Sequence, residues 1–260
     1  MSLAATFSDT RVLAGRQLRR VPRQPDLLIG YTIQPIMFVL LFRYVFGGAI
    51  QTPGFDNYAQ FLMPGIIVQS IAFGGFVTAL AVADDMSKGL MDRFRSLPMS
   101  RSAVLAGRAV ADIVLNSLQL VLLIVVGLVV GFSFGSGVGQ VVLGIVLLLM
   151  IGYAFSWVFA LIGLAGGSAE SANAIGFTVI FPLTFASGIF VPPATMPDGL
   201  RQFADANPFT TWVDAIRHLF VGGPAAPANS DVWVSFLWVI GITVVAAFFA
   251  VRKFRSSVGH

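Results

Sequence analysis

The chain has 260 residues, of which 57% are hydrophobic and 11% are charged, with a formal net charge of +4 and no cysteine. Soluble domains carry about 25% charged residues, so this composition excludes an ordinary soluble globular protein. The lack of cysteine excludes disulfides and thiolate metal sites.

Six apolar segments are long enough, at about 20 residues, to cross a bilayer as helices. We therefore predict an all-α membrane protein with one six-span domain over 27–251. The spans are expected at 27–48, 57–83, 103–132, 138–166, 171–190 and 231–251. The first apolar run follows a basic stretch, as in a signal peptide, but it exceeds the usual signal core of about 7–15 residues. We expect it to be retained as a span.

The basic residues gather in three places. Thirteen of the sixteen Lys and Arg precede the first span, lie in or beside 84–101, or follow the last span. With six spans these three groups fall on one side of the membrane, which the positive-inside rule makes the cytoplasm. We therefore expect both termini to be cytoplasmic, including the tail 252–260. A nucleic-acid partner is not expected, because the hydropathy explains the basic groups better.

Residues 1–26 are predicted to form an interfacial helix, in which Phe7, Leu13 and Leu18 give an apolar side and the arginines face lipid phosphates. A solvated basic tail that only sets the topology explains the same residues equally well. Within the first span, Arg43 lies near the outer end, where we expect its side chain to snorkel to the headgroups.

The segment 84–101 joins the second and third spans and is predicted to form a short amphipathic helix on the cytoplasmic face. Leu90, Met91, Phe94 and Leu97 recur at helical spacing, with Asp92, Arg93 and Arg95 between them. Pro98 ends the pattern. We interpret this helix as the element that receives force from another protein.

Asp112, Asn116 and Gln119 of the third span stand at i, i+4 and i+7, on one helical face. Together with Gln69 of the second span, they are candidates for a translocation path or for hydrogen bonds across a helix interface, including one between two copies. Arg108 lies one turn before Asp112 and is expected to neutralise it.

Motifs that would indicate an enzyme are incomplete in this sequence. Gly131, Ser133 and Gly135 match a hydrolase pattern, but that pattern needs a nearby histidine, and the chain holds only His218 and His260. We expect a glycine-rich external turn there and a solvated turn charge at Glu170. No phosphate-binding loop or metal-binding motif occurs, so we expect no enzyme, metal or cofactor in this chain. Its energy would come from a separate subunit or from an ion gradient.

The segment before the last span is the second informative one. Pro182 breaks the fifth span, and two short amphipathic helices follow, the first ending at Asn207 and Pro208 and the second carrying Asp214 and Arg217. We predict that residues 191–230 form an external cap at the membrane interface.

The run 89–101 resembles the cytoplasmic loop of type-2 ABC transporter permeases, especially daunorubicin-resistance-type drug-efflux permeases. A second set of residues resembles the same family's signature before its last span: Ser187, Gly188, Phe190, Pro192, Pro197, Asn207, Pro208 and Arg217. The resemblance implies an N-terminal connecting helix and a coupling helix that docks on a separate ATP-binding subunit. Its contact tip would be Asp92, Arg93, Phe94 and Arg95.

The resemblance further implies two permeases, identical or homologous, with two ATP-binding subunits that hold the ATP and Mg. Its substrate would be hydrophobic or amphipathic, such as drugs or lipids, exported across the cytoplasmic membrane of a bacterium. Export of polysaccharide or lipid-linked glycan by the same architecture is the nearest alternative. A gradient-driven carrier is another, although the few carboxylates within the spans argue against it.

Overall fold

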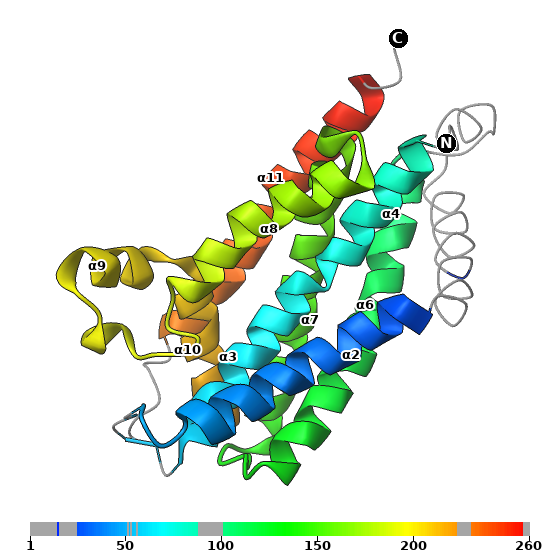
Figure 1. Cartoon of the computed structure of the whole chain (residues 1–260). Coiled ribbons are helices and arrows are strands. Elements are labelled where there is room, and N and C mark those ends of the chain that lie inside the picture. Colours follow the sequence, from blue (N-terminus) through cyan, green and yellow to red (C-terminus); the bar gives the residue numbers. More distant parts are fainter. Residues whose placement is uncertain are drawn as a thin grey trace.

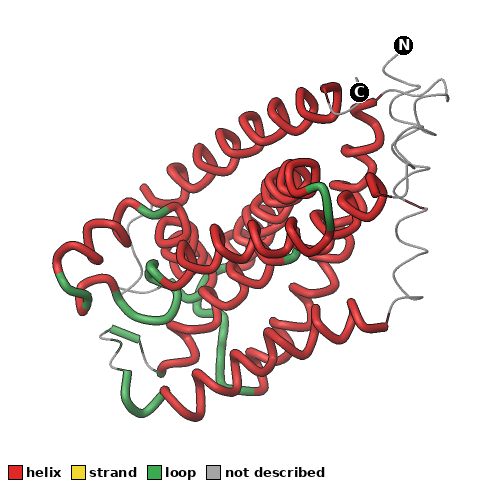
Figure 2. The backbone as a smooth tube through the Cα atoms, turned by 45° about the horizontal axis from the view of Figure 1, so that its top comes forward, coloured by secondary structure: helices red, strands yellow, loops and turns green. Residues whose placement is uncertain are grey.

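The computed structural model describes residue 15 and residues 25–50, 52, 54–55, 57–87, 101–222 and 230–256, and every regular element within them is helical (Figures 1 and 2). The elements are α2 (Pro25–Leu40), the π-helical turn η2 (Leu41–Phe46), α3 (Tyr58–Phe73), α4 (Gly75–Ser87), α6 (Arg101–Val129), α7 (Val138–Gly166), α8 (Ala169–Phe185), the 3-10 turn η3 (Pro193–Thr195), α9 (Asp198–Ala206), α10 (Pro208–Phe220) and α11 (Ser230–Ser256). Most of the predicted N-terminal helix 1–26 lies outside the described residues.

A helix stands at each of the six predicted spans, and four of these helices are long and apolar enough to cross a membrane. Those four run over Tyr58–Met86, Arg108–Val129, Val138–Gly166 and Asp231–Phe254. At the predicted first span, the apolar helix Thr32–Phe46 is shorter. At the predicted fifth span, α8 has 17 residues. The described part of the chain is therefore all-helical, with four long candidate spans.

Helix α7 is the axis of the bundle. It is apolar on all sides, as expected of a helix that other helices surround. It packs against α3, α4, α6, α8, α10 and α11. Three glycines let neighbours approach closely: Gly144 faces Phe220 of α10, Gly152 faces Asn116 of α6, and Gly163 faces Ala79 of α4.

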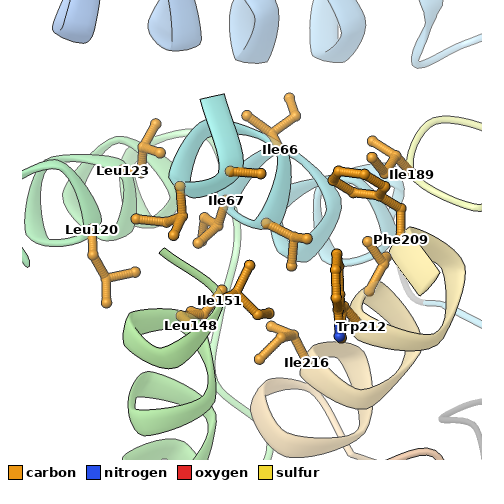
Figure 3. Packing of buried hydrophobic residues seen from close by; sticks show 14 of the residues in the cluster. Ile66, Ile67, Leu120, Leu123, Leu148, Ile151, Ile189, Phe209, Trp212 and Ile216 are labelled. Carbon is orange, nitrogen blue, oxygen red and sulfur yellow. The ribbon is translucent and has the colours of Figure 1, made fainter. Parts of the chain in front are cut away.

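The main apolar core lies between α3, α6, α7 and α10 (Figure 3). Ile67 of α3 points toward Leu148 and Ile151 of α7 there, and Trp212 of α10 completes the cluster without any exposed surface. Burial of this size stabilises a fold by about 1.5–3 kcal/mol per large apolar side chain in water. Helix α10 is thus built into the bundle, whereas Ala204 is the only buried residue of α9.

The bundle has two distinct ends (Figure 1). The end of α4, the start of α6 and the end of α11 lie together, joined by a second apolar cluster that includes Val82, Ala109 and Phe254. Arg252 and Lys253 also lie at this end of α11. Helices α9 and α10 lie at the opposite end.

The turn 130–137 joins α6 to α7 at the end that also holds α10. Gly131 has a φ of +97°, a left-handed conformation that glycine adopts without strain. The Ser133 hydroxyl accepts a hydrogen bond from Gln60 Nε2 at 3.2 Å, and the Gly135 amide donates to the Phe220 carbonyl at 3.0 Å. Each of these contacts holds the glycine-rich turn against neighbouring elements.

Candidate functional site

The predicted contact tip, Asp92, Arg93, Phe94 and Arg95, lies outside the described residues. Its two flanks are described: α4 ends at Ser87 and α6 begins at Arg101. Thr78 of α4 donates a short hydrogen bond to Asp112 of α6. The structure therefore shows the two helices that flank the tip in the sequence.

A cavity of about 240 Å³ opens among α2, α3, α4, α6 and α8, around the break between α3 and α4 at Gly74. Carboxamides and a hydroxyl make up its polar lining, and phenylalanine rings dominate its apolar lining. The lining residues are Gln34, Pro35, Phe38, Gln69, Ser70, Phe73, Gly74, Phe76, Val77, Gln119, Asn173, Phe177 and Phe181. Apolar walls with a few polar groups are typical of sites for small amphipathic molecules.

Helix α8 supplies one wall of this cavity. Asn173, Phe177 and Phe181 stand four residues apart and share one face of the helix. The rings form a stacked row, with 4.9 Å between the centroids of Phe177 and Phe181 and 4.3 Å between those of Phe181 and Phe185. Phe73 meets the Phe177 ring edge to face at 6.3 Å. The row offers flat aromatic surface beside the amide of Asn173.

Two of the predicted polar residues face this cavity. Gln69 Nε2 donates to the Thr184 hydroxyl at 3.2 Å and so links α3 to α8, and Gln119 reaches the cavity from α6. Both side chains are buried. The other two predicted residues are not among its lining residues. Asp112 bonds to Thr78, and Asn116 packs against Gly152 of α7.

Arg217 connects several segments at the end of the bundle that holds α9 and α10. Its guanidinium donates to the Phe61 carbonyl at 3.1 and 3.0 Å, to the Gly188 carbonyl at 2.8 Å and to Asp214 Oδ1 at 2.9 Å. It also stacks 3.6 Å above the centroid of the Phe61 ring. With 2% of its surface exposed, this one side chain joins α10 to α3 and to the loop after α8.

Burial raises the pKa of the Asp214 carboxyl from its ordinary value, and the charge of Arg217 opposes that rise. Burial also lowers the pKa of the Arg217 guanidinium, opposed by Asp214. A guanidinium is the most basic side chain in proteins, and here it is surrounded by acceptors that favour its charged form. The carbonyls of Phe61 and Gly188, that of Ile189 at 3.3 Å and the Asp214 carboxylate compensate for removing that charge from water.

Asn207 fixes the start of α10 to the end of α8. Its side-chain oxygen accepts from the Phe209 amide at 3.0 Å, a helix cap, while its Nδ2 donates to the carbonyls of Leu183 and Ala186 at 2.7 and 2.9 Å. Both carbonyls lie at the C-terminal end of α8, which continues past Pro182 to Phe185, so the expected break at Pro182 does not occur. Pro208 occupies the first position of α10, where its missing amide has no consequence.

The other signature residues lie in or beside the same junction. Ser187 donates to the Thr184 carbonyl at 2.6 Å, and the Gly188 amide donates to the Thr210 hydroxyl at 3.0 Å. The Phe190 ring stacks on Phe42 with 4.3 Å between centroids. Pro192 and Pro197 immediately precede η3 and α9. The structure therefore brings Arg217, Asn207, Ser187 and Gly188 together.

Three partners of this junction were absent from the sequence prediction. Phe61 offers its carbonyl and ring to Arg217, and the Tyr58 hydroxyl donates to the Phe190 carbonyl at 3.2 Å. Gly65 lies against the Ile189 backbone, where an added Cβ would approach the Ile189 oxygen to 2.7 Å. The glycine after Pro64 is the one sequence signal that indicates such a close approach.

Arg43 connects η2 to the end of α6. Its Nε donates to the Val130 carbonyl at 3.2 Å, at the end of α6, so the side chain binds protein. Within the described part of the chain, no group of three or more His, Asp or Glu side chains is arranged to hold a metal ion.

Comparison with known proteins assigns this arrangement to a family. The family model of the ABC-2 type transporter matches residues 8–221. A daunorubicin resistance ABC transporter permease protein of Streptomyces coeruleorubidus is 32% identical over 257 residues, covering 99% of this chain and 89% of that protein. A doxorubicin resistance ABC transporter permease protein of Mycobacterium tuberculosis is 24% identical over 262 residues, covering 94% of this chain and 90% of that protein.

Proposed function

The chain belongs to the ABC-2 type transporter family, and from that premise we propose that it exports amphipathic drugs or lipids across the cytoplasmic membrane of a bacterium. As a permease of this family, it is the multi-pass membrane subunit of a transporter whose ATP is bound by a partner subunit. The names of its relatives support drug export, since they are resistance permeases for daunorubicin and doxorubicin.

The cavity among α2, α3, α4, α6 and α8 is the observation that carries this proposal. Phenylalanine rings such as Phe177 and Phe181 offer stacking surface, and Gln69, Gln119 and Asn173 offer amides at fixed positions. An amphipathic aromatic molecule needs both kinds of contact. Because the cavity surrounds the middle of the span Tyr58–Met86, a molecule held there would be part of the way across the membrane.

In the proposed topology, α2 with η2 and α8 complete a set of six spans. The end that holds Arg252 and Lys253 faces the cytoplasm, as the positive-inside rule favours, with both chain termini on that side. The segment 84–101 then reaches the ATP-binding subunit from the cytoplasmic face, and α9 lies outside. A second permease, identical or homologous, completes the transporter.

The experiment for export uses the permease purified with its ATP-binding subunit and placed in lipid vesicles. Movement of doxorubicin, as an amphipathic aromatic probe, and of a fluorescent phospholipid is followed by fluorescence. We expect ATP to drive movement of at least one of them and a non-hydrolysable ATP analogue to drive none. Movement that needs no ATP and stops when a proton gradient is removed would overturn the proposal in favour of a gradient-driven carrier.

Contact through the cytoplasmic segment has a separate test. Reversing the charge at Arg93→Glu and Arg95→Glu together should leave the permease in the membrane and remove the ATP-binding subunit from a pull-down, because like charges would face the docking surface. Arg201→Glu in exposed α9 is the matched control and should retain the subunit. Retention by the double variant would contradict the assigned contact.

A further inference from the structure

Two polar contacts join α4 to α6, the helices on either side of the cytoplasmic segment. Arg108 Nη1 pairs with Asp85 Oδ2 at 3.4 Å, and the Thr78 hydroxyl donates to Asp112 Oδ2. Asp85 and Thr78 stand seven residues apart on one face of α4, and Arg108 and Asp112 stand four apart on one face of α6. The contacts therefore form two successive connections along an antiparallel pair of helices.

These connections matter because α4 and α6 otherwise touch little. Each helix packs extensively against α7 and only slightly against the other. Arg108 and Asp85 each have 9% of their side-chain surface exposed, and Asp112 is also buried. Arg108 stands one helical turn before Asp112 on α6, a spacing at which opposite charges attract. Arg108 thus pairs with a carboxylate of α4 and stands one turn from a carboxylate on its own helix.

Separating α4 from α6 here would leave charges unpaired in a region shielded from water, which is strongly disfavoured. The second apolar cluster lies at the same end and joins Val82 of α4 and Ala109 of α6 to Trp157 of α7 and Phe254 of α11. Both kinds of contact oppose independent movement of the two helix ends. A force on the segment between them is therefore applied to both helices together.

We propose that Asp85, Arg108, Asp112 and Thr78 are positioning residues that transmit movement of the cytoplasmic segment into the membrane helices. This inference rests on the proposed function, because it assumes that the segment docks on the ATP-binding subunit. Packed side chains and salt-bridge networks are the physical means by which distant sites are coupled. Helix α4 also lines the cavity through Phe76 and Val77, so movement of α4 changes the cavity directly.

The test separates coupling from folding. Replacing Arg108 alone would leave two buried carboxylates without their cation, so Asp85→Asn and Thr78→Val are better variants, alone and combined. Each removes one connection to α6, keeps the side-chain volume nearly constant and leaves the Arg108–Asp112 interaction in place. Thr243→Val is the matched control, since the Thr243 hydroxyl donates only within its own helix, to Val239 at 2.7 Å.

The measurement is doxorubicin or fluorescent phospholipid moved per ATP hydrolysed, by the purified complex in lipid vesicles. We expect this ratio to fall about tenfold in the Asp85→Asn/Thr78→Val double variant, within the usual range of energetic coupling, while ATP hydrolysis continues. The control Thr243→Val should keep the ratio of the unaltered chain. Asp85→Glu and Thr78→Ser, which retain the charge and the hydroxyl, should restore most of it.

An unchanged ratio in the double variant, with the complex assembled, would overturn the inference and leave the proposed function standing. An equal fall in Thr243→Val would also overturn it, because the loss of any threonine hydroxyl would then suffice. If the unaltered complex moves neither probe with ATP, the proposed function itself fails and this inference fails with it. Co-purification of the ATP-binding subunit with each variant shows that the variant is folded.

Discussion

Arg217 is a residue on which three separate segments converge: α10, α3 and the loop after α8. It binds the carbonyls of Phe61 and Gly188 and the carboxylate of Asp214. A planar guanidinium serves several acceptors at fixed angles, whereas a lysine ammonium is a single point of charge. The identity of the cation is therefore as important here as its charge.

Replacing Arg217 should destabilise the protein more than any exposed arginine does. For Arg217→Met we expect the free energy of unfolding to fall by about 3–5 kcal/mol, because its buried acceptors lose their donor. For Arg217→Lys we expect the free energy of unfolding to fall by roughly half as much. Unfolding of the purified protein in detergent micelles gives these values.

Arg201→Met provides the comparison, since Arg201 makes an exposed pair with Asp205 at 3.8 Å. That change should alter stability by less than about 0.5 kcal/mol. Equal stability of Arg217→Met and Arg201→Met would show that the buried contacts of Arg217 contribute nothing.

Gly65 permits α3 to lie directly against the loop after α8. A methyl group there would reach the Ile189 oxygen, so Gly65→Ala should push the loop away and cost about 1–3 kcal/mol. Gly241→Ala is the matched control within helix α11, where an added Cβ meets nothing within 4 Å. That change should be neutral or stabilise the helix by up to about 1 kcal/mol. Thermal unfolding of the two variants measures the difference. Equal shifts of the two unfolding midpoints would contradict a close approach of the loop to Gly65.

At the scale of elements, helix α8 both lines the cavity and anchors neighbouring segments, and different residues of the helix make the two kinds of contact. One face carries the aromatic row toward the cavity, and its last turn holds the hydrogen bonds to Asn207 and Gln69. The helix is capped at its start by Ser168, whose hydroxyl accepts from the Ser171 amide at 3.1 Å. Fixation at both ends leaves the aromatic face in a defined position.

Phe181→Ala should weaken binding of an aromatic probe without unfolding the bundle. Loss of one ring contact is worth about 0.5–1.5 kcal/mol, so the Kd of doxorubicin should rise roughly three- to tenfold in the purified complex. Phe249→Ala in α11 is the control, because Phe249 is 48% exposed on an outward face and should leave the Kd unchanged. A Kd that is equal in both variants would remove the aromatic row from the binding site.

How much of this could be read from the sequence depends on the kind of signal. The long helices α6, α7 and α11 follow directly from apolar runs of membrane length, and α10 follows from apolar residues at helical spacing. The partners of Arg217 cannot be predicted from the sequence, because backbone carbonyls have no sequence signature. The contact between Thr78 and Asp112 was also missed, since a single threonine in an apolar helix is common.

The division of the polar stripe on α6 shows the same limit. Asp112, Asn116 and Gln119 share a face by spacing, yet only Gln119 is among the cavity-lining residues. One face of a helix can pack against two neighbouring helices, and the sequence does not show which residues of the face contact which helix. Here α7 covers the position of Asn116 through Gly152, and α4 covers that of Asp112.

For the whole molecule, orientation in the membrane is the property that every functional proposal uses. Helix α7 has 29 residues and is about 43 Å long, so its two ends can reach opposite faces of a bilayer. Because the chain has no cysteine, a single introduced thiol reports on one position alone. Val138→Cys and Ala169→Cys mark the two ends.

We expect a membrane-impermeant maleimide to label Val138→Cys in intact cells and to label Ala169→Cys only after the membrane is opened. Both positions are exposed in the structure, so access from each side of the membrane decides the result. Labelling of both thiols in intact cells, or the reverse pattern, would contradict the proposed orientation and with it a cytoplasmic position for the segment 84–101.

The glycines of α7 also impose an order on biosynthesis. Gly152 and Gly163 receive neighbours from α6 and α4, which the ribosome makes before α7, whereas Gly144 receives Phe220 of α10, which it makes afterwards. At about 5–20 residues per second, α10 is completed roughly 3–10 s after α7. The neighbours of α7 at Gly152 and Gly163 are therefore available before its neighbour at Gly144. Until α10 is made, the surface of α7 at Gly144 lacks its contact with Phe220.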